Sequence, residues 1–217
     1  MQGQISQQNC RRIRRRIIQT AVRLHREIGY KKTTVADIAH GASMSPSNVY
    51  RFFSSRQAIE EAVVADLFEQ VCAAAMLAAR VGGSALERLR AALRAISQLH
   101  DHRQANDSKL NELMGAAVRE KWSVTRCHAD RIRGVVRTII VAGQASGEIR
   151  PGSSMALACC LLDAMDAYLS PLPTNAAGVR PTLDEMIDFC ARSLRDAPRR
   201  QSMDTGADLR PRAVAHG

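Results

Sequence analysis

The chain has 217 residues, of which 46% are hydrophobic and 4% aromatic, and its net charge is +10 at pH 7. This composition argues against a β-sandwich or barrel, whose strands need more β-branched and aromatic residues, and favours an all-α protein. No apolar run is long enough to span a bilayer, because Asp163 and Asp166 interrupt the best candidate, 155–169. The polar N-terminus lacks the apolar segment of a secretory signal, so we expect a cytoplasmic protein that does not bind membranes.

The excess positive charge lies almost entirely in the first 56 residues. This segment holds eleven Lys and Arg against two acids, Glu27 and Asp37, which leaves +9. The rest of the chain holds 20 basic and 19 acidic residues. A polyanionic partner explains this asymmetry better than general solubility does.

The first helix is predicted from about Arg11 to Gly29, after a polar segment, 1–10, that we expect to be disordered. Gly29 is suited to end the helix, since glycine readily adopts a C-terminal cap conformation. The apolar residues of the helix lie on one stripe at helical spacing: Ile13, Ile17, Ala21, Leu24 and Ile28.

Residues 33–56 are predicted to form two short helices joined by a tight turn at 41–44. Thr34 and Asp37 have the spacing of a capping box at the start of the first helix. Ser45 as N-cap and Pro46 at the first helical position open the second helix. The expected inner face of this second helix is Val49, Phe52 and Phe53.

Six further helices are expected beyond this unit. Ser54 or Ser55 caps a long helix from Arg56 to about residue 80, and the others span about 85–103, 107–121, 123–146, 154–169 and 182–196. The segment 198–217 shows no periodicity and is expected to be a disordered tail. The predicted domains are therefore 11–57 and 58–197.

The residues of the N-terminal unit resemble the tetracycline-repressor (TetR) family of bacterial regulators over about residues 11–60. The residues that carry the resemblance are Gly29, Thr33-Thr34, Ile38-Ala39, Ser45, Val49-Tyr50, Phe53 and Ser55-Arg56. The resemblance implies a three-helix helix-turn-helix DNA-binding domain followed by a helical effector-binding and dimerisation domain. It also implies a repressor that an unknown small molecule releases from a palindromic DNA operator, and a homodimer formed through the helices at about 154–169 and 182–196.

Three residues depart from the usual pattern of the family. Ser43 stands where a turn glycine is usual, and if this position needs a positive φ, serine costs about 1 kcal/mol there. Ser47 replaces a frequent glycine, and Phe52 replaces a common His or Tyr. A phosphate contact from position 52 is therefore not expected.

The predicted DNA-binding residues divide by chemistry. Arg56 and Tyr50 are expected to bind phosphates, together with Thr33 or Thr34 at a helix N-terminus. Base reading is expected from Ser47, Asn48 and Arg51, because Asn pairs with adenine and Arg with guanine, with Pro46 against a thymine methyl. Ser45 completes the set. The alternatives are that Tyr50 only fills the core, that Asn48 faces water, and that the arginines at 11–16 form a solvated face.

The second domain gives weaker indications. His100, Met114 and Trp122 are candidate effector contacts, although each could be ordinary core or surface. Leu157, Leu161, Met165 and Tyr168 form an apolar stripe that belongs either to the protomer core or, as we expect, to a dimer interface. The six cysteines contain no C-x-x-C pair and are expected to be mostly small core residues.

No cofactor, metal site or catalytic residue is predicted. The acids Asp163 and Asp166 have no histidine at helical spacing, and the chain has no Gly-rich phosphate loop or nucleophile elbow. A small helical enzyme is therefore the weakest of three hypotheses. The second is a DNA-binding regulator without a small-molecule effector, controlled by a protein partner or a thiol switch.

Overall fold

The computed structural model describes residues 2–172 and 179–195, with side chains from residue 7 onward. Over these residues the chain is all-α, and its only β-type pairing is an isolated bridge between Ile149 and Arg195. The helices are α1 (Gln2–Ile28), α2 (Val35–Gly41), α3 (Pro46–Tyr50), α4 (Arg56–Ala78), α5 (Ala85–Asn106), α6 (Ser108–Arg119), α7 (Ser123–Ala145), α8 (Ser154–Leu169) and α9 (Leu183–Leu194). None of them is long and apolar enough to cross a membrane.

Helix α1 begins at Gln2, so the expectation that residues 1–10 are disordered is wrong for 2–10. The segment 2–10 extends the helix because it is rich in Gln, a good helix former, and contains no proline. It has no apolar stripe, so the helical period did not predict this extension. The second expected tail, 198–217, lies outside the described residues.

The caps of the short helices are those predicted. Thr34 and Asp37 bond reciprocally in a capping box, and the hydroxyl of Ser45 accepts from the backbone N–H of Asn48 at 3.2 Å. Ser55, rather than Ser54, caps α4. Local hydrogen bonding therefore sets the boundaries of a unit too small to bury a core of its own.

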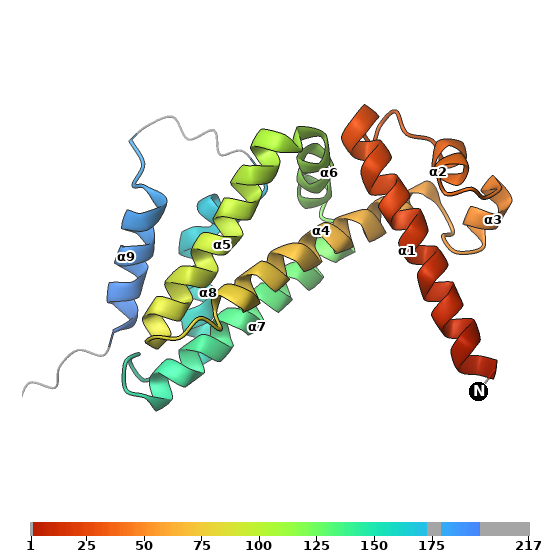
Figure 1. The fold of residues 1–217 in the computed structure, drawn as a ribbon. Helices are drawn as coiled ribbons and strands as arrows, with labels where there is room; N and C mark the ends of the chain where they lie inside the picture. The colour runs from red at the N-terminus through yellow and green to blue at the C-terminus, as the bar shows by residue number, and fades with distance from the viewer. Residues whose placement is uncertain (1, 173–178, 196–217) are drawn as a thin grey trace, which may run out of the picture.

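Two hydrophobic cores share α4, which runs from the N-terminal helices to the far end of the molecule alongside α7 (Figure 1). Ile59, Val63 and Leu67 belong to the N-terminal core, whereas Val71 and Ala75 belong to the second core. Helix α6 packs its residues Leu110, Leu113 and Met114 into the N-terminal core. The N-terminal helices α1, α2 and α3 therefore rest on both α4 and α6.

The apolar stripe of α8 faces the protomer's own core. Leu157, Leu161 and Met165 are buried there, so the expectation that this stripe forms the dimer interface is wrong. A helical period identifies an apolar face but not the surface it packs against. The exposed residues of α8 are the small Ala156, Cys160 and Ala164 together with Met155, Asp163 and Asp166.

The cysteines are less buried than expected. Cys72 and Cys190 are buried, Cys159 is intermediate, and Cys10, Cys127 and Cys160 are exposed. Asp163 and Asp166 are exposed, and the described residues contain no group of His, Cys, Asp and Glu side chains suited to hold a metal ion.

Candidate nucleic-acid interface

Helix α3 presents its polar residues to solvent. Pro46, Ser47 and Arg51 are exposed and Tyr50 is 51% exposed, while Asn48 is half-buried. Val49 and Phe53 are buried and Phe52 is half-buried, so the inner face is the one expected. Because the helix has only five residues, this orientation places every predicted base-reading side chain on one small surface.

An arginine of α1 fixes α3 from behind. The guanidinium of Arg14 donates to the carbonyl of Phe52 and lies 4.1 Å from the centroid of the Phe53 ring. A charged hydrogen bond and a cation–π contact together hold the end of α3 against α1. Arg14 is thus a supporting residue in this structure.

The two threonines before α2 occupy different environments. Thr33 is 1% exposed and donates its hydroxyl to the carbonyl of Gly29 at 2.9 Å. Thr34 is exposed, although its hydroxyl also donates to Asp37 at 2.7 Å. Of the two residues between which the sequence did not decide, only Thr34 lies on the surface.

Arg56 is held by the protein itself. Its Nε donates to Glu60 at 2.8 Å and its Nη2 to the carbonyl of Tyr30 at 2.6 Å. The side chain is 42% exposed, and among the described residues Nη1 has no protein hydrogen bond. The residue ties the start of α4 to the end of α1.

Of the three candidate effector contacts, only His100 lines one of the two central cavities. Met114 is fully buried, with its sulfur 3.9 Å from Arg103. Trp122 is also buried and donates its indole N–H to Glu120 at 3.0 Å. Both residues pack in the N-terminal core.

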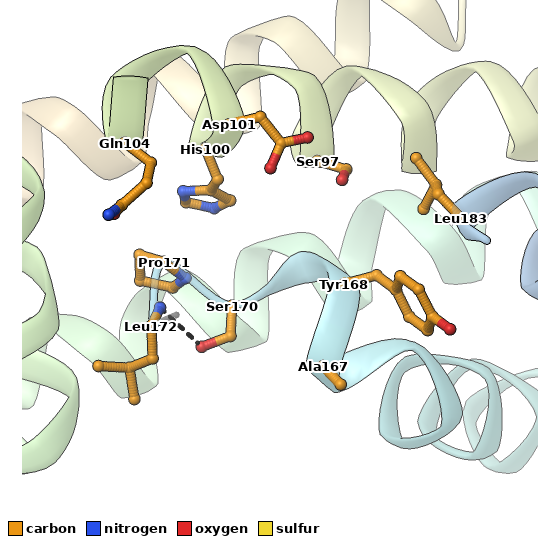
Figure 2. Close-up of a pocket in the computed structure, with 10 residues that line it drawn as sticks. All are labelled: Ser97, His100, Asp101, Gln104, Ala167, Tyr168, Ser170, Pro171, Leu172 and Leu183. Atoms are coloured by element: carbon orange, nitrogen blue, oxygen red, sulfur yellow. Dashed lines mark hydrogen bonds between the residues drawn. The ribbon is translucent and has the colours of Figure 1, made fainter. Parts of the chain in front are cut away.

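The two cavities lie on either side of Ser170 and Pro171, which line both. The first, of about 240 Å³, lies between α5, the end of α8 and the start of α9, and contains His100 (Figure 2). The second, of about 250 Å³, is more apolar and contains Phe68 and His128.

The sequence analysis missed His128. Its ring stacks on Phe68 with centroids 4.1 Å apart, and its Nδ1 lies 3.5 Å from the sulfur of Cys72. Burial, followed by the neighbouring His100, lowers the pKa of His128 to about 4, so the ring is neutral at pH 7. No sequence motif pointed to it, because its contacts come from Phe68 and Cys72 of α4, far away in the chain.

Polar contacts join α6 to the DNA-binding domain. Arg26 of α1 forms a two-bond ion pair with Asp107, at 2.6 and 3.1 Å, and Lys31 bonds Glu112 at 2.8 Å. Lys109 donates to the carbonyl of Glu27 at 2.6 Å. A displacement of α6 would therefore move or strain these bonds to α1 and the turn that follows it.

Two models of bacterial regulator domains match the chain. One, described as bacterial regulatory proteins of the tetR family, matches residues 17–63, and the other, a tetracyclin repressor-like C-terminal domain, matches residues 85–188. The chain belongs to the TetR family. Its fold is that of a DNA-binding transcriptional regulator of this family.

Solved structures agree with this TetR-family fold. RolR in complex with resorcinol is 18% identical, with a TM-score of 0.61 over 86% of this chain and 89% of that chain. A TetR-family transcriptional regulator from Vibrio parahaemolyticus is 17% identical, with a TM-score of 0.55 over 85% of this chain and 100% of that chain. A tetR-family regulatory protein from Rhodococcus RHA1 is 21% identical, with a TM-score of 0.55 over 86% and 98%. No curated protein matches the chain.

Proposed function

We propose that this TetR-family protein is a homodimeric repressor that binds a palindromic DNA operator and is released by a small molecule. The observation that carries the proposal is the capped helix α3, whose exposed Pro46, Ser47, Tyr50 and Arg51 lie within the basic part of the chain. A helix of this kind fits the major groove, where base edges differ in their donors and acceptors.

The proposed roles follow from exposure. Ser47, Asn48 and Arg51 read bases, and Pro46 contacts a thymine methyl group. Tyr50 and Thr34 bind phosphates, and Arg56 does so through Nη1, the nitrogen that its bonds to Glu60 and Tyr30 leave unused. Thr33 contributes by holding the turn rather than by touching DNA, because its side chain is buried. Ser45 presets the N-terminus of α3, whose backbone N–H groups favour an anion.

The exposed sides of α8 and α9 form the proposed dimer interface. Ala156, Cys160 and Ala164 allow a second copy of α8 to approach closely, and two large apolar side chains are exposed on these helices, Met155 of α8 at 46% and Phe189 of α9 at 64%. A two-fold axis through these helices pairs each surface with itself, as a closed dimer requires. The proposed operator then has two half-sites about one DNA turn apart.

A small-molecule effector is supported by the two central cavities. RolR, a protein of the same fold, was solved with the ligand resorcinol. The alternative is control through thiols, which the exposure of Cys10, Cys127 and Cys160 favours. Replacing these three cysteines by serine leaves the response to effector intact under our proposal and abolishes regulation under the alternative.

The test is binding of the purified protein to a duplex from its own upstream region, followed by fluorescence anisotropy at several salt concentrations. Arg51→Ala and Asn48→Ala are expected to lose about 1–3 kcal/mol each and to relax base preference. The matched control is Arg80→Ala, which removes an exposed positive charge at the far end of α4. A binding constant that does not change with salt, or equal losses in Arg51→Ala and Arg80→Ala, would refute the proposed interface.

A further inference from the structure

His100 of α5 is buried without a hydrogen-bond partner for either ring nitrogen. The residue is 4% exposed, and neither Nδ1 nor Nε2 is bonded within the protein. Figure 2 shows the ring pointing from α5 toward Ser170 and Pro171 across the first cavity. Folded proteins rarely leave such groups unpaired, because each unmet bond costs free energy. Each nitrogen has less than 1 Å² of accessible surface, so a molecule in the cavity bonds the ring only after a small shift of the side chains that cover it.

The neighbours of His100 divide the cavity into a polar and an apolar side. Ser97 and Gln104 lie about one turn before and one turn after His100 on α5. The Oε1 atom of Gln104 already accepts from Asn111, which leaves its NH₂ group to donate. On the other side, Pro171, Leu172 and Leu183 supply apolar contacts (Figure 2), while the hydroxyls of Tyr168 and Ser170 already bond the carbonyl of Pro181 and the backbone N–H of Leu172. Such a cavity suits a compact molecule with polar groups on one edge.

The charges around the cavity select against ions. The one formally charged residue among its described lining residues is Asp101, which repels an anion. Arg103, one turn along α5, is 3% exposed and bonds the neutral side chain of Gln70 at 2.8 Å, so it opposes a cation. Burial, followed by Arg103, lowers the pKa of His100 to about 4. At pH 7 the imidazole therefore offers one donor and one acceptor.

We propose that the His100 cavity is the effector site and that it takes a small neutral ring carrying hydroxyl groups, which both donate to and accept from His100 and its neighbours Ser97 and Gln104. The role of this ligand as an effector rests on the proposed regulatory function, whereas binding of the ligand to the cavity does not depend on that function. The volume of about 240 Å³ lies below the ~300–1,000 Å³ of drug-sized sites, which limits the ligand to a single ring or a similar size.

The rim of the cavity is connected to the DNA-binding domain. Asn111 of α6 is buried, and its Nδ2 donates both to Gln104 and, at 3.0 Å, to the carbonyl of Pro171. Asp107, just before α6, pairs with Arg26 of α1, and Glu112 of α6 pairs with Lys31, just after α1. A ligand hydroxyl that donates to Oε1 of Gln104 competes with Asn111 for that oxygen and so acts on a helix that supports α1.

The first test measures binding with matched probes. Catechol, resorcinol, hydroquinone and cis-1,2-cyclohexanediol are titrated into the full-length protein, with benzoate as the anion and benzylamine as the cation, and imidazole C–H signals are followed by NMR. At least one diol is expected to shift the His100 signal, with the exposed His102 unchanged, and to bind at least tenfold more tightly than either ion. The proposal is overturned if no diol shifts His100, or if either ion binds as tightly as the best diol.

The second test uses variants that keep the fold. His100→Phe retains a ring but removes both nitrogens, and His100→Leu serves if phenylalanine does not fit. Either is expected to weaken diol binding at least tenfold and to melt no lower than the wild type, because two unpaired nitrogens are removed. The control His102→Gln leaves binding unchanged. Diol binding that survives in both His100 variants overturns the site.

A DNA-binding measurement separates this inference from the proposed function. Without a probe, His100→Phe is expected to bind the upstream duplex as the wild type does, and diols are expected to release the wild type but not the variant. If the wild type fails to bind DNA, the proposed function is wrong while the NMR titration still decides the ligand site. If diols bind at His100 yet leave the DNA complex intact, the effector role is overturned.

Discussion

Each of the two domains buries a histidine whose ring nitrogens lack protein partners, His25 in α1 and His100 in α5. Their exposures are 1% and 4%, and burial followed by a nearby arginine, Arg56 or Arg103, lowers both pKa values to about 4. They differ in what lies beside the ring. His100 lines a cavity, whereas His25 lines neither central cavity. An unpaired buried group therefore indicates a site only where a ligand has room to reach it.

The largest expected effect is on the pH dependence of stability, which both histidines share. Each folded-state pKa lies below the ordinary value of 6.5, so between pH 6.5 and 4 the unfolded chain binds a proton that the folded chain does not. Stability is then complete above about pH 6.5 and falls as the pH drops toward 4, by about 3 kcal/mol for each histidine. Urea unfolding at pH 7 and at pH 4.5 measures the loss.

The variants His25→Phe and His100→Phe isolate two contributions to this pH dependence, and the buried His128, whose pKa is also lowered to about 4, adds a third. Each is expected to flatten the pH dependence by a similar amount, because the burial and the nearby arginine are similar. A bound diol is expected to change only the contribution of His100 to the pH dependence of stability. If His25→Phe alone flattened the curve, the His100 ring would be reachable by water, and the parallel between the two domains would fail.

The two domains also differ in how much of them the sequence predicts. Thr34 with Asp37, and Ser45 with Pro46, act through bonds to residues at most three positions away, so the boundaries of α2 and α3 follow from local chemistry. The effector contacts depend on residues far apart in the chain. Met114 and Trp122 are buried in the N-terminal core because α6 packs there, a fact of tertiary arrangement that no period reveals. The same limit explains the mistaken interface on Leu157 and Leu161.

A glycine in α7 tests whether the second domain is loosely packed apart from its cavities. A Cβ added at Gly143 would lie 2.6 Å from Ile149 Cδ1 and 2.8 Å from Ala85 Cβ. Gly143→Ala is therefore expected to destabilise the protein by about 1–3 kcal/mol through overpacking. The control Gly134→Ala has nothing within 4 Å and is expected to stabilise the same helix by roughly 0.5–1 kcal/mol. Thermal unfolding of both variants measures these changes in stability. If Gly143→Ala did not change stability, the core around Gly143 would be loosely packed, and the His100 cavity would be a further instance of the same loose packing.

The smallest expected effect comes from a backbone feature that occurs once in each domain. Ser43, in the turn before α3, and Lys121, after α6, adopt φ values of 53° and 56°, where a side chain crowds the backbone. The condition under which serine was expected to be costly at position 43, a positive φ, is thus met. Ser43→Gly and Lys121→Gly are each expected to gain about 0.5–1 kcal/mol, because glycine relieves the crowding but adds entropy to the unfolded chain. Chemical denaturation measures both, with Ser54→Gly as a control outside the left-handed region.

Since Ser43 sets the angle at which α3 leaves α2, a gain in stability with unchanged DNA affinity would show that serine holds the turn in the same geometry as glycine. A change in DNA affinity for Ser43→Gly, absent from Lys121→Gly, would show instead that this turn helps to aim the recognition helix.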